Sequence, residues 1–556
     1  MSPHATSGPV DLILHGGAIY TTDKLRSWVE AMAIRDGRIV AIGRDDDVRA
    51  LAGPGAKETN LRGKMVIPGI IDVHNHHMSG GQAALYETTF SPMLTLEAIL
   101  DMVRERAASS APGKWIYGGI WGSHLMSKLA AAAALKALDA ASDGHPVMLR
   151  DDSNHNRWVN SRAMELIGIT SQTRDPADGR IVRDADSHEP TGLLFEKASA
   201  LAEKAVLDSV ANQAGRAINA ARRAVQILNG YGITGFQDAA AGLPVLEALK
   251  QLDANGELSA WCVASLPAQP SIFGEDIYGD ALVARREEFR SAHVRPDFVK
   301  IFMDGVPPSR TAAMIEPYVP DLALGCCFRG EAKMSVPELA RMIAKYEAQG
   351  FGVKIHCAGD GAVRVTLDAI DVVRSFNGPG RVHHIAHASF IDPADVPRFK
   401  ELNVVADLSP IIWYPGPIVA AIREVVPKDR AERFWPNRDL LEAGALMAAG
   451  SDWPVMPQPD PWLGIEGMVT RQNPKGEFPG ALWPEQALDL ATVLEIYTIN
   501  SARAMGMDGI TGSLETGKSA DFAILDRKLF ETPASDLADT KILATYFEGR
   551  PVFEQA

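Results

Sequence analysis

Two histidines stand two positions apart at the end of an apolar segment. His74 and His76 follow residues 66–73, which read Val-Ile-Pro-Gly-Ile-Ile-Asp-Val. In a β-strand, residues i and i+2 point to the same side, so the two imidazoles would face one point in space. Imidazole is the commonest protein ligand for zinc and related metals. The pair therefore predicts half of a metal site at the end of a buried strand.

Four more polar side chains stand in, or at the ends of, other apolar segments. Each one alone is more typical of a turn, a helix cap or a lysine that reaches solvent. Together they add two imidazoles, an ammonium group and a carboxylate: Lys300, His356, His387 and Asp452. Because the six residues come from five separate strand-like segments, their joint occurrence predicts a single site at neighbouring strand ends.

The lysine has a specific chemical use in such a set. A protonated Lys300 offers only donors and cannot bind a metal. Burial among histidines would favour loss of its proton, and the free amine could then take up carbon dioxide. The resulting carbamate could bridge two metal ions, and ions ~3.5–4 Å apart can activate a water and polarise a carbonyl. Asp452 would accept the water proton and pass it to the leaving group.

Strand-like and helical segments alternate through the middle of the chain, which is typical of a parallel sheet in an α/β protein. Eight β-rich segments end near His76, Asp238, Leu266, Asp304, Cys357, His387, Ser409 and Asp452. Eight such units predict a (β/α)8 TIM-like barrel, in which active residues lie at the carboxyl ends of the strands. The first two segments are far apart, where ~30 residues would suffice for a crossover. Residues 79–228 are therefore expected to form an insertion that covers the barrel mouth.

Both ends of the chain carry short strands, too few at either end for a stable sheet. In the N-terminal part, Asp36-Gly37 between two apolar segments predicts a hairpin. Residues 521–525 and 544–547 have the same character near the C-terminus. We expect a small β-sandwich from residues 1–66 and 510–556 beside a barrel domain over residues 67–509.

Composition restricts the partners. A formal net charge of −15 argues against nucleic acids and anionic membrane surfaces. No uncharged apolar run approaches the ~20 residues that span a bilayer, and the first ten residues do not resemble a signal peptide. Four cysteines make no disulfide framework and fit a reducing cytoplasm. The expected partner is a small-molecule substrate.

Six segments resemble the amidohydrolase superfamily, and in particular the branch that contains N-substituted formamide deformylase. They are residues 68–76, 299–305, 309–313, 355–360, 450–455 and 512–521. The resemblance implies one metal on His74, His76 and Asp452, a second on His356 and His387, and a carboxylated Lys300 between them. It also implies one or two Zn²⁺ ions, with other divalent metals open, and a possible homodimer.

Candidate substrate contacts lie outside this set. Within the inserted region the resemblance implies that His155 faces the substrate, and a packing role is its alternative. Arg310 could bind a substrate carboxylate, and a structural ion pair is equally open. Large aromatic residues near strand ends or in the insertion would favour an apolar or aromatic substrate, with core packing as the alternative. These are Trp121 and Trp453, the two candidates for substrate binding, with Trp158, Trp413 and Tyr414.

The leading hypothesis is metal-dependent hydrolysis of an amide-type C–N bond other than a peptide bond. Ester or lactone hydrolysis stays open, because the same site could support it. Aromatic deamination is less favoured, since Gly359 stands where deaminases on this scaffold carry a glutamate, three residues after His356. A non-catalytic metal-binding or regulatory protein is the alternative of another class, and the complete set of ligands argues against it.

Overall fold

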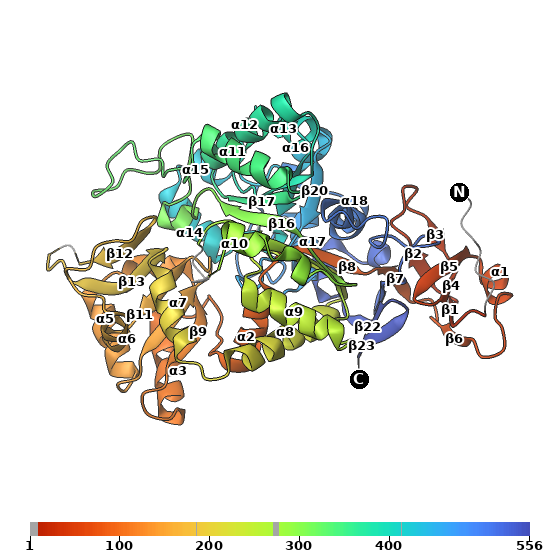
Figure 1. The fold of residues 1–556 in the computed structure, drawn as a ribbon, viewed down its shortest axis with the longest axis horizontal. Coiled ribbons are helices and arrows are strands. Elements are labelled where there is room, and N and C mark those ends of the chain that lie inside the picture. Colours follow the sequence, from red (N-terminus) through yellow and green to blue (C-terminus); the bar gives the residue numbers. More distant parts are fainter. Residues whose placement is uncertain (1–8, 185, 271–276, 413, 556) are drawn as a thin grey trace.

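A central parallel sheet of eight strands dominates the structure, a computed structural model that describes residues 9–184, 186–270, 277–412 and 414–555 (Figure 1). Its strand order is β20-β19-β18-β17-β16-β15-β14-β8. The strands are β8 (Ile70–Asn75), β14 (Ile233–Asp238), β15 (Trp261–Pro267), β16 (Val294–Phe302), β17 (Gly352–Cys357), β18 (His383–His387), β19 (Val404–Leu408) and β20 (Leu446–Ala449). The predicted (β/α)8 barrel is confirmed.

Nearly all residues of these strands are buried, because side chains fill the barrel and helices cover it. This double burial explains why the strands read as continuous apolar runs rather than as alternating ones. The longest covering helices follow the strands in chain order: α9 (Leu243–Ala254), α11 (Val336–Glu347) and α12 (Asp360–Asn377), with α8 (Gln213–Gly230) preceding β14. They surround the barrel in Figure 1.

The barrel closes through the segment that follows β20. The backbone N–H of Asp452 donates to the carbonyl of His74 at 2.7 Å, and that of His76 donates to Trp453 at 2.8 Å. Gly450 permits this approach, since a Cβ there would lie 2.5 Å from Cβ of His74. Closure therefore joins the ends of the first and last strands, where three of the predicted metal ligands stand.

Two sheets pack beside the barrel: the first contains N-terminal strands alone, so the expectation that neither end suffices for a sheet was wrong for that end, and the second combines strands of both chain ends. One has the order β5-β4-β1-β6 and the other the order β23-β22-β21-β7-β2-β3. Their strands are β1 (Leu12–His15), β2 (Ala18–Tyr20), β3 (Trp28–Val29), β4 (Ala31–Arg35), β5 (Arg38–Gly43), β6 (Lys57–Asn60), β7 (Met65–Pro68), β21 (Phe522–Leu525), β22 (Ile542–Phe547) and β23 (Arg550–Glu554). One apolar cluster contains side chains of both sheets, including Leu14, Met32, Phe522 and Tyr546, so the two form a sandwich. The predicted turn at Asp36-Gly37 connects β4 to β5, with positive φ at both residues.

The segment between β8 and β14 forms a layer of its own, with the sheet order β12-β13-β11-β10-β9. The strands are β9 (Ile116–Trp121), β10 (Val147–Asp151), β11 (Asn156–Val159), β12 (Gly179–Arg183) and β13 (Pro190–Glu196). Helices α3 (Leu96–Ser109) and α5 (Ala132–Ala141) share an apolar cluster with one face, and α6 (Ser161–Ile167) and α7 (Ser199–Asp208) with the other. The layer lies beside the barrel in Figure 1, joined to it through α2 (His77–Tyr86), which packs on α8.

No helix in the described parts of the chain has the length and apolar character needed to cross a membrane.

Candidate metal centre

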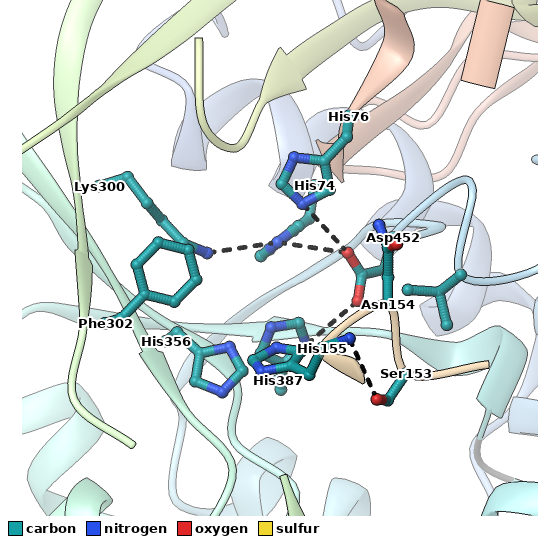
Figure 2. A pocket seen from close by; sticks show the side chains of 11 residues that line it. His74, His76, Ser153, Asn154, His155, Lys300, Phe302, His356, His387 and Asp452 are labelled. Carbon is teal, nitrogen blue, oxygen red and sulfur yellow. Dashed lines mark hydrogen bonds and ion pairs between the residues drawn. The ribbon is translucent and has the colours of Figure 1, made fainter. Parts of the chain in front are cut away.

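All six predicted ligand side chains line one pocket at the carboxyl ends of the barrel strands (Figure 2). The pocket has an empty volume of about 300 Å³. Its lining is completed by Phe302 and Val455 from the barrel and by Ser153, Asn154 and His155 from the insertion. Residues from five barrel strands and from a separate layer thus surround a single small space.

Asp452 lies at the centre of the histidines. Its Oδ1 is 3.6 Å from Nε2 of His74 and 3.6 Å from Nε2 of His76, and its Oδ2 is 3.8 Å from Nδ1 of His387. The ring centroids of His356 and His387 are 4.6 Å apart, so the fourth imidazole adjoins the same group. Asp452 has φ of 52°, which turns its side chain back toward the strand ends.

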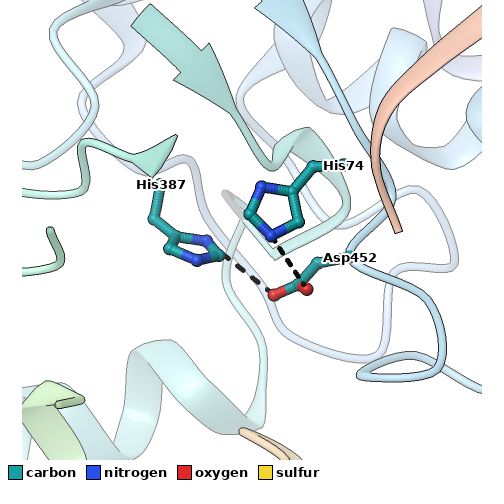
Figure 3. Close-up of side chains that lie close together, drawn as sticks. All are labelled: His74, His387 and Asp452. Carbon is teal, nitrogen blue, oxygen red and sulfur yellow. Dashed lines mark ion pairs between the residues drawn. The ribbon is translucent and has the colours of Figure 1, made fainter. Parts of the chain in front are cut away.

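The donor set fits a divalent metal of the zinc type. One potential ligand atom each from His74, His387 and Asp452 lies within 4.8 Å of the other two (Figure 3). Burial lowers the pKa of His74 and His387 well below the usual value, and lowers the pKa of His76 to about 3. The imidazoles are therefore neutral at physiological pH, the form in which a ring nitrogen binds metal.

Lys300 is almost completely buried among these histidines. Its Nζ lies 3.5 Å from Nε2 of His74 and 4.9 Å from the centre of the Phe302 ring. Burial and the nearby Lys354 ammonium lower the pKa of Lys300 to about 8. A substantial neutral fraction of this amine is thus available near neutral pH, which carbamate formation requires.

The pKa of Asp452 is shifted upward, in contrast to that of Lys300. Burial raises the pKa of its carboxyl to about 7, even though Lys300 acts to lower it. The turn that carries it is fixed by Asp72, whose carboxylate accepts hydrogen bonds from the backbone N–H (3.0 Å) and the hydroxyl (2.6 Å) of Ser451. A carboxyl group held in place with a pKa near neutrality can both accept and release a proton.

A second layer of charged residues supports His74. Oδ2 of Asp407, in β19, lies 3.3 Å from Nδ1 of His74 and forms an ion pair with Lys354 of β17. Lys354 also donates to the carbonyl of Val73 at 2.9 Å. Burial opposes ionisation of Asp407, but Lys354 and His74 together hold its pKa well below the usual value. A carboxylate behind a ligating imidazole fixes the ring orientation and raises its basicity.

Two further histidines of the pocket also have partners. Nε2 of His356 lies 3.0 Å from the carbonyl oxygen of Gly305, and Nδ1 of His387 lies 3.2 Å from Oγ of Ser409. Asp304, close to His356, accepts three backbone N–H groups, two of them from Ala358 and Gly359. The bonds of Asp304 and His356 connect the segments after β16 and β17, and the bond of His387 connects β18 to the segment after β19.

Comparison with known proteins places this geometry in context. Residues 57–553 match the family model described as Amidohydrolase family. This chain belongs to the amidohydrolase family. It is 28% identical over 552 residues to N-substituted formamide deformylase of Arthrobacter pascens, covering 97% of both chains. It is 30% identical over 550 residues to Protein LONG AFTER FAR-RED 3 of Arabidopsis thaliana, covering 98% of this chain and 91% of that one.

A solved structure supports the same assignment. An uncharacterized metal-dependent hydrolase from Pyrococcus horikoshii OT3 superposes with a TM-score of 0.71 at 25% identity, over 93% of this chain and 97% of the other. Family and fold agree, so the protein is an enzyme, a metal-dependent hydrolase.

Of the two polar residues predicted to contact the substrate, only His155 lines the metal pocket. His155 lines the pocket, with its ring centre 5.1 Å from that of His356. Arg310 does not line it: one guanidinium nitrogen donates to the carbonyl of Val319 at 2.5 Å and another lies 3.9 Å from Asp321. The structural ion pair that the sequence left open is the arrangement observed for this side chain.

The predicted aromatic wall is also absent from the pocket as far as the structure describes it. Trp121 is fully buried in the core of the insertion and donates to the carbonyl of Leu149 at 3.1 Å. Trp453 packs against α2, where a Cβ on Gly80 would overlap its ring. Trp158 packs in the same core as Trp121, and Trp413 lies outside the described residues. These three tryptophans are buried and do not line the metal pocket, an arrangement that agrees with core packing, the alternative to substrate contact.

Sequence reasoning missed the supporting residues, above all Asp407, Lys354 and Glu196. The first two carried a usable signal, because a charged residue inside an otherwise apolar strand needs a buried partner. Glu196 carried no such signal in the sequence, since it stands at the end of a strand of the insertion and not inside it. Its role depends on contacts with loops more than 100 residues away.

Proposed function

We propose that this amidohydrolase cleaves an amide-type C–N bond, other than a peptide bond, in a small molecule that carries an apolar or aromatic group. The observation that carries the proposal is the convergence of four imidazoles, one lysine and one aspartate on a single buried pocket. A relative that matches over almost the whole chain is named N-substituted formamide deformylase. N-substituted formamides are therefore the first substrates to test.

The proposed ligands divide between two positions. His74, His76 and Asp452 would hold one ion, and His356 and His387 the second, with Lys300 as a carbamate between them. Zn²⁺ is the proposed metal, because imidazole and carboxylate donors suit it. When bound, a divalent ion of this kind lowers the pKa of water and polarises a carbonyl group.

Asp452 is the proposed proton carrier. Its carboxylate takes a proton from the attacking water as the new C–O bond forms at the carbonyl carbon. The C–N bond then breaks, and the same proton passes from Asp452 to the leaving nitrogen. A pKa raised to about 7 suits both steps, because the group is then neither too weak a base nor too weak an acid.

The insertion supplies the remaining contact. His155 faces the pocket beside His356, and its Nδ1 is occupied by Glu196 at 2.9 Å. The other ring nitrogen is thereby left for a hydrogen bond to the substrate. Ser153 and Asn154 line the pocket next to it and reduce the access of bulk water.

The test combines metal analysis with a substrate panel. Purified protein should contain at least one equivalent of divalent metal and should release amines from N-formyl or N-acyl compounds with zinc supplied. Asp452→Asn should lower turnover by about 10²–10⁴-fold while metal remains bound. Matched esters in the panel distinguish amide from ester hydrolysis, and amino-heterocycles test deamination. Full activity of Asp452→Asn would refute the proton-carrier role, and metal-free protein would refute the whole proposal.

A further inference from the structure

A second, larger hollow lies next to the metal pocket. Its empty volume is about 830 Å³, which includes space open to solvent. The walls come from the insertion, from the loop after β19 with helix α14 (Pro417–Val425), and from helix α17 (Pro461–Thr470). Apolar side chains dominate the lining, among them Met93, Ile411, Ile412, Tyr414, Ile418 and Leu463.

Two chain segments contribute to the lining of both the hollow and the metal pocket. Asp152 lines the hollow, whereas the next residue, Ser153, lines the metal pocket. On the opposite side, Val455 lines the metal pocket and the next residue, Met456, lines the hollow. Because consecutive Cα atoms are only ~3.8 Å apart, the two spaces share walls in both the insertion and the barrel.

The polar groups in the hollow are engaged with the chain itself or lie at its mouth. The carboxylate of Asp152 accepts hydrogen bonds from the backbone N–H (2.8 Å) and the hydroxyl of Ser123. Asn473 donates to the carbonyl of Pro415 at 2.9 Å and accepts from the backbone of Lys475 at 2.9 Å. Lys475 itself is exposed. Glu477 is exposed as well, so among the described lining residues none presents an unengaged buried charge to an ionic substrate group, and the interior offers mainly apolar surface.

We propose that this hollow binds an uncharged alkyl or aryl group attached to the carbonyl-containing group that reacts in the metal pocket. The inference rests on the proposed function and adds the place where the apolar group binds, which favours amides with a bulky apolar substituent. Ile412, Ile418 and Leu463 are the residues that would determine specificity, because they are half-buried apolar side chains of the lining. Tyr414 is the one aromatic candidate from the sequence that, among the described residues, lines this space.

The decisive experiment uses ligands that bind but cannot be hydrolysed. Methyl ketones from 2-butanone to 2-nonanone carry a carbonyl and an apolar chain without a C–N bond, and their Kd for the wild-type protein is measured by calorimetry. Burial of each methylene at ~0.8 kcal/mol predicts about fourfold tighter binding per added carbon. Ile418→Trp and Leu463→Trp, which fill the hollow, should abolish this gain for chains beyond a few carbons. Leu463→Ala should preserve it.

Leu201→Trp serves as the matched control, because Leu201 is 39% exposed on α7 and does not line either space. Circular dichroism of each variant verifies folding. Equal dependence on chain length in wild type, control and both filling variants would overturn the inference, as would an absence of chain-length dependence in the wild type.

The two proposals can fail separately. Chain-length-dependent ketone binding without hydrolysis of any amide would support the hollow and refute amide hydrolysis. Hydrolysis of N-alkylformamides at rates independent of chain length, together with a ketone Kd that does not depend on chain length, would support amide hydrolysis. The same result would refute binding of the apolar group in the hollow. A second series, N-methylalkanamides, shows whether the apolar group belongs to the acyl or the amine side.

Discussion

Nδ1 of His155 lies 2.9 Å from Oε2 of Glu196, a pair within the insertion, and Glu196 in turn contacts the loop that follows β16 of the barrel. The other carboxylate oxygen of Glu196 accepts a hydrogen bond from Oγ1 of Thr311 at 2.7 Å, and Nζ of Lys333 lies 3.9 Å from Oε2. Glu196 is buried at the end of β13 with φ of 52°, a conformation that costs energy in a residue other than glycine. The histidine that faces the metal pocket is thus positioned by a carboxylate held on both sides.

Glu196→Gln should lower kcat by about tenfold to hundredfold, because the ring of His155 would lose its charged partner and its fixed orientation. Glu196 acts through His155, so we expect metal content and thermal stability to change little. Steady-state kinetics with metal analysis makes the measurement. His155→Gln combined with Glu196→Gln should be no worse than His155→Gln alone.

The control for this series is Glu189→Gln, an exposed glutamate of the same insertion. If Glu196→Gln lowered metal content in step with activity, a role in metal retention would replace the positioning role.

Asp407→Asn should weaken metal binding by about 10–100-fold, because the carboxylate behind His74 is lost. It should also destabilise the fold by about 3–5 kcal/mol, since Lys354 would remain buried without its counter-charge. The double variant Asp407→Leu with Lys354→Met removes both charges and should recover much of the stability. Its metal affinity should stay low, and titration with a chelator measures that affinity. Recovery of both properties together would exclude a specific role of Asp407 at His74.

Stability should depend on pH through His293, which links the barrel to the C-terminal sheet. Its Nδ1 lies 2.6 Å from Asp253, and its Nε2 lies 3.4 Å from Glu548. Burial acts to lower the pKa of His293, but the hydrogen bonds to Glu548 and Asp253 raise it above the ordinary value. A histidine whose pKa is higher in the folded state stabilises the protein fully at pH values below its unfolded pKa of ~6.5. This stabilisation is lost as the pH rises through the pKa of the folded state.

Accordingly, His293→Gln should lower the Tm more at pH 5.5 than at pH 9. The corresponding difference in the free energy of unfolding should be ~1 kcal/mol or less, because His293 and its acidic partners are partly exposed. Scanning calorimetry at both pH values makes the comparison, with the exposed His188→Gln as control. A larger loss of Tm at pH 9 would contradict the sign of this effect.

Gly81→Val should destabilise the protein by about 1–3 kcal/mol, the usual cost of overpacking. Gly81 of α2 faces α8 so closely that a Cβ would overlap the carbonyl oxygen of Ala220. Because α2 begins directly after His76, its displacement should also weaken metal binding. Gly509→Val is the matched control, since a Cβ there meets no atom within 4 Å. Thermal unfolding of the two variants is compared, and equal stabilities would show that α2 and α8 can separate freely.

Local sequence patterns were sufficient to predict the barrel and the inward direction of the polar side chains at its strand ends. A period of two is a local property of a strand, so His74 and His76 had to face the same side. Buried strands between amphipathic helices likewise specify a parallel barrel, which gathers Lys300, His356, His387 and Asp452 at one rim. These features depend on residues close together in the chain.

Other contacts between side chains that are distant in sequence became visible only in the folded chain. Arg310 and Trp121 had suitable types and positions, yet one is bound by its own loop and the other lies in the core of the insertion. Asp407 of β19 lies beside His74 of β8 inside the barrel, and Glu196 contacts His155 within the insertion and Thr311 in the loop after β16. The apolar hollow arises in the same way, from surfaces of the insertion and the barrel that are remote in sequence. The contacts of Glu196 and the shape of the hollow follow from loop conformation and packing between layers, for which side-chain periodicity carries no signal.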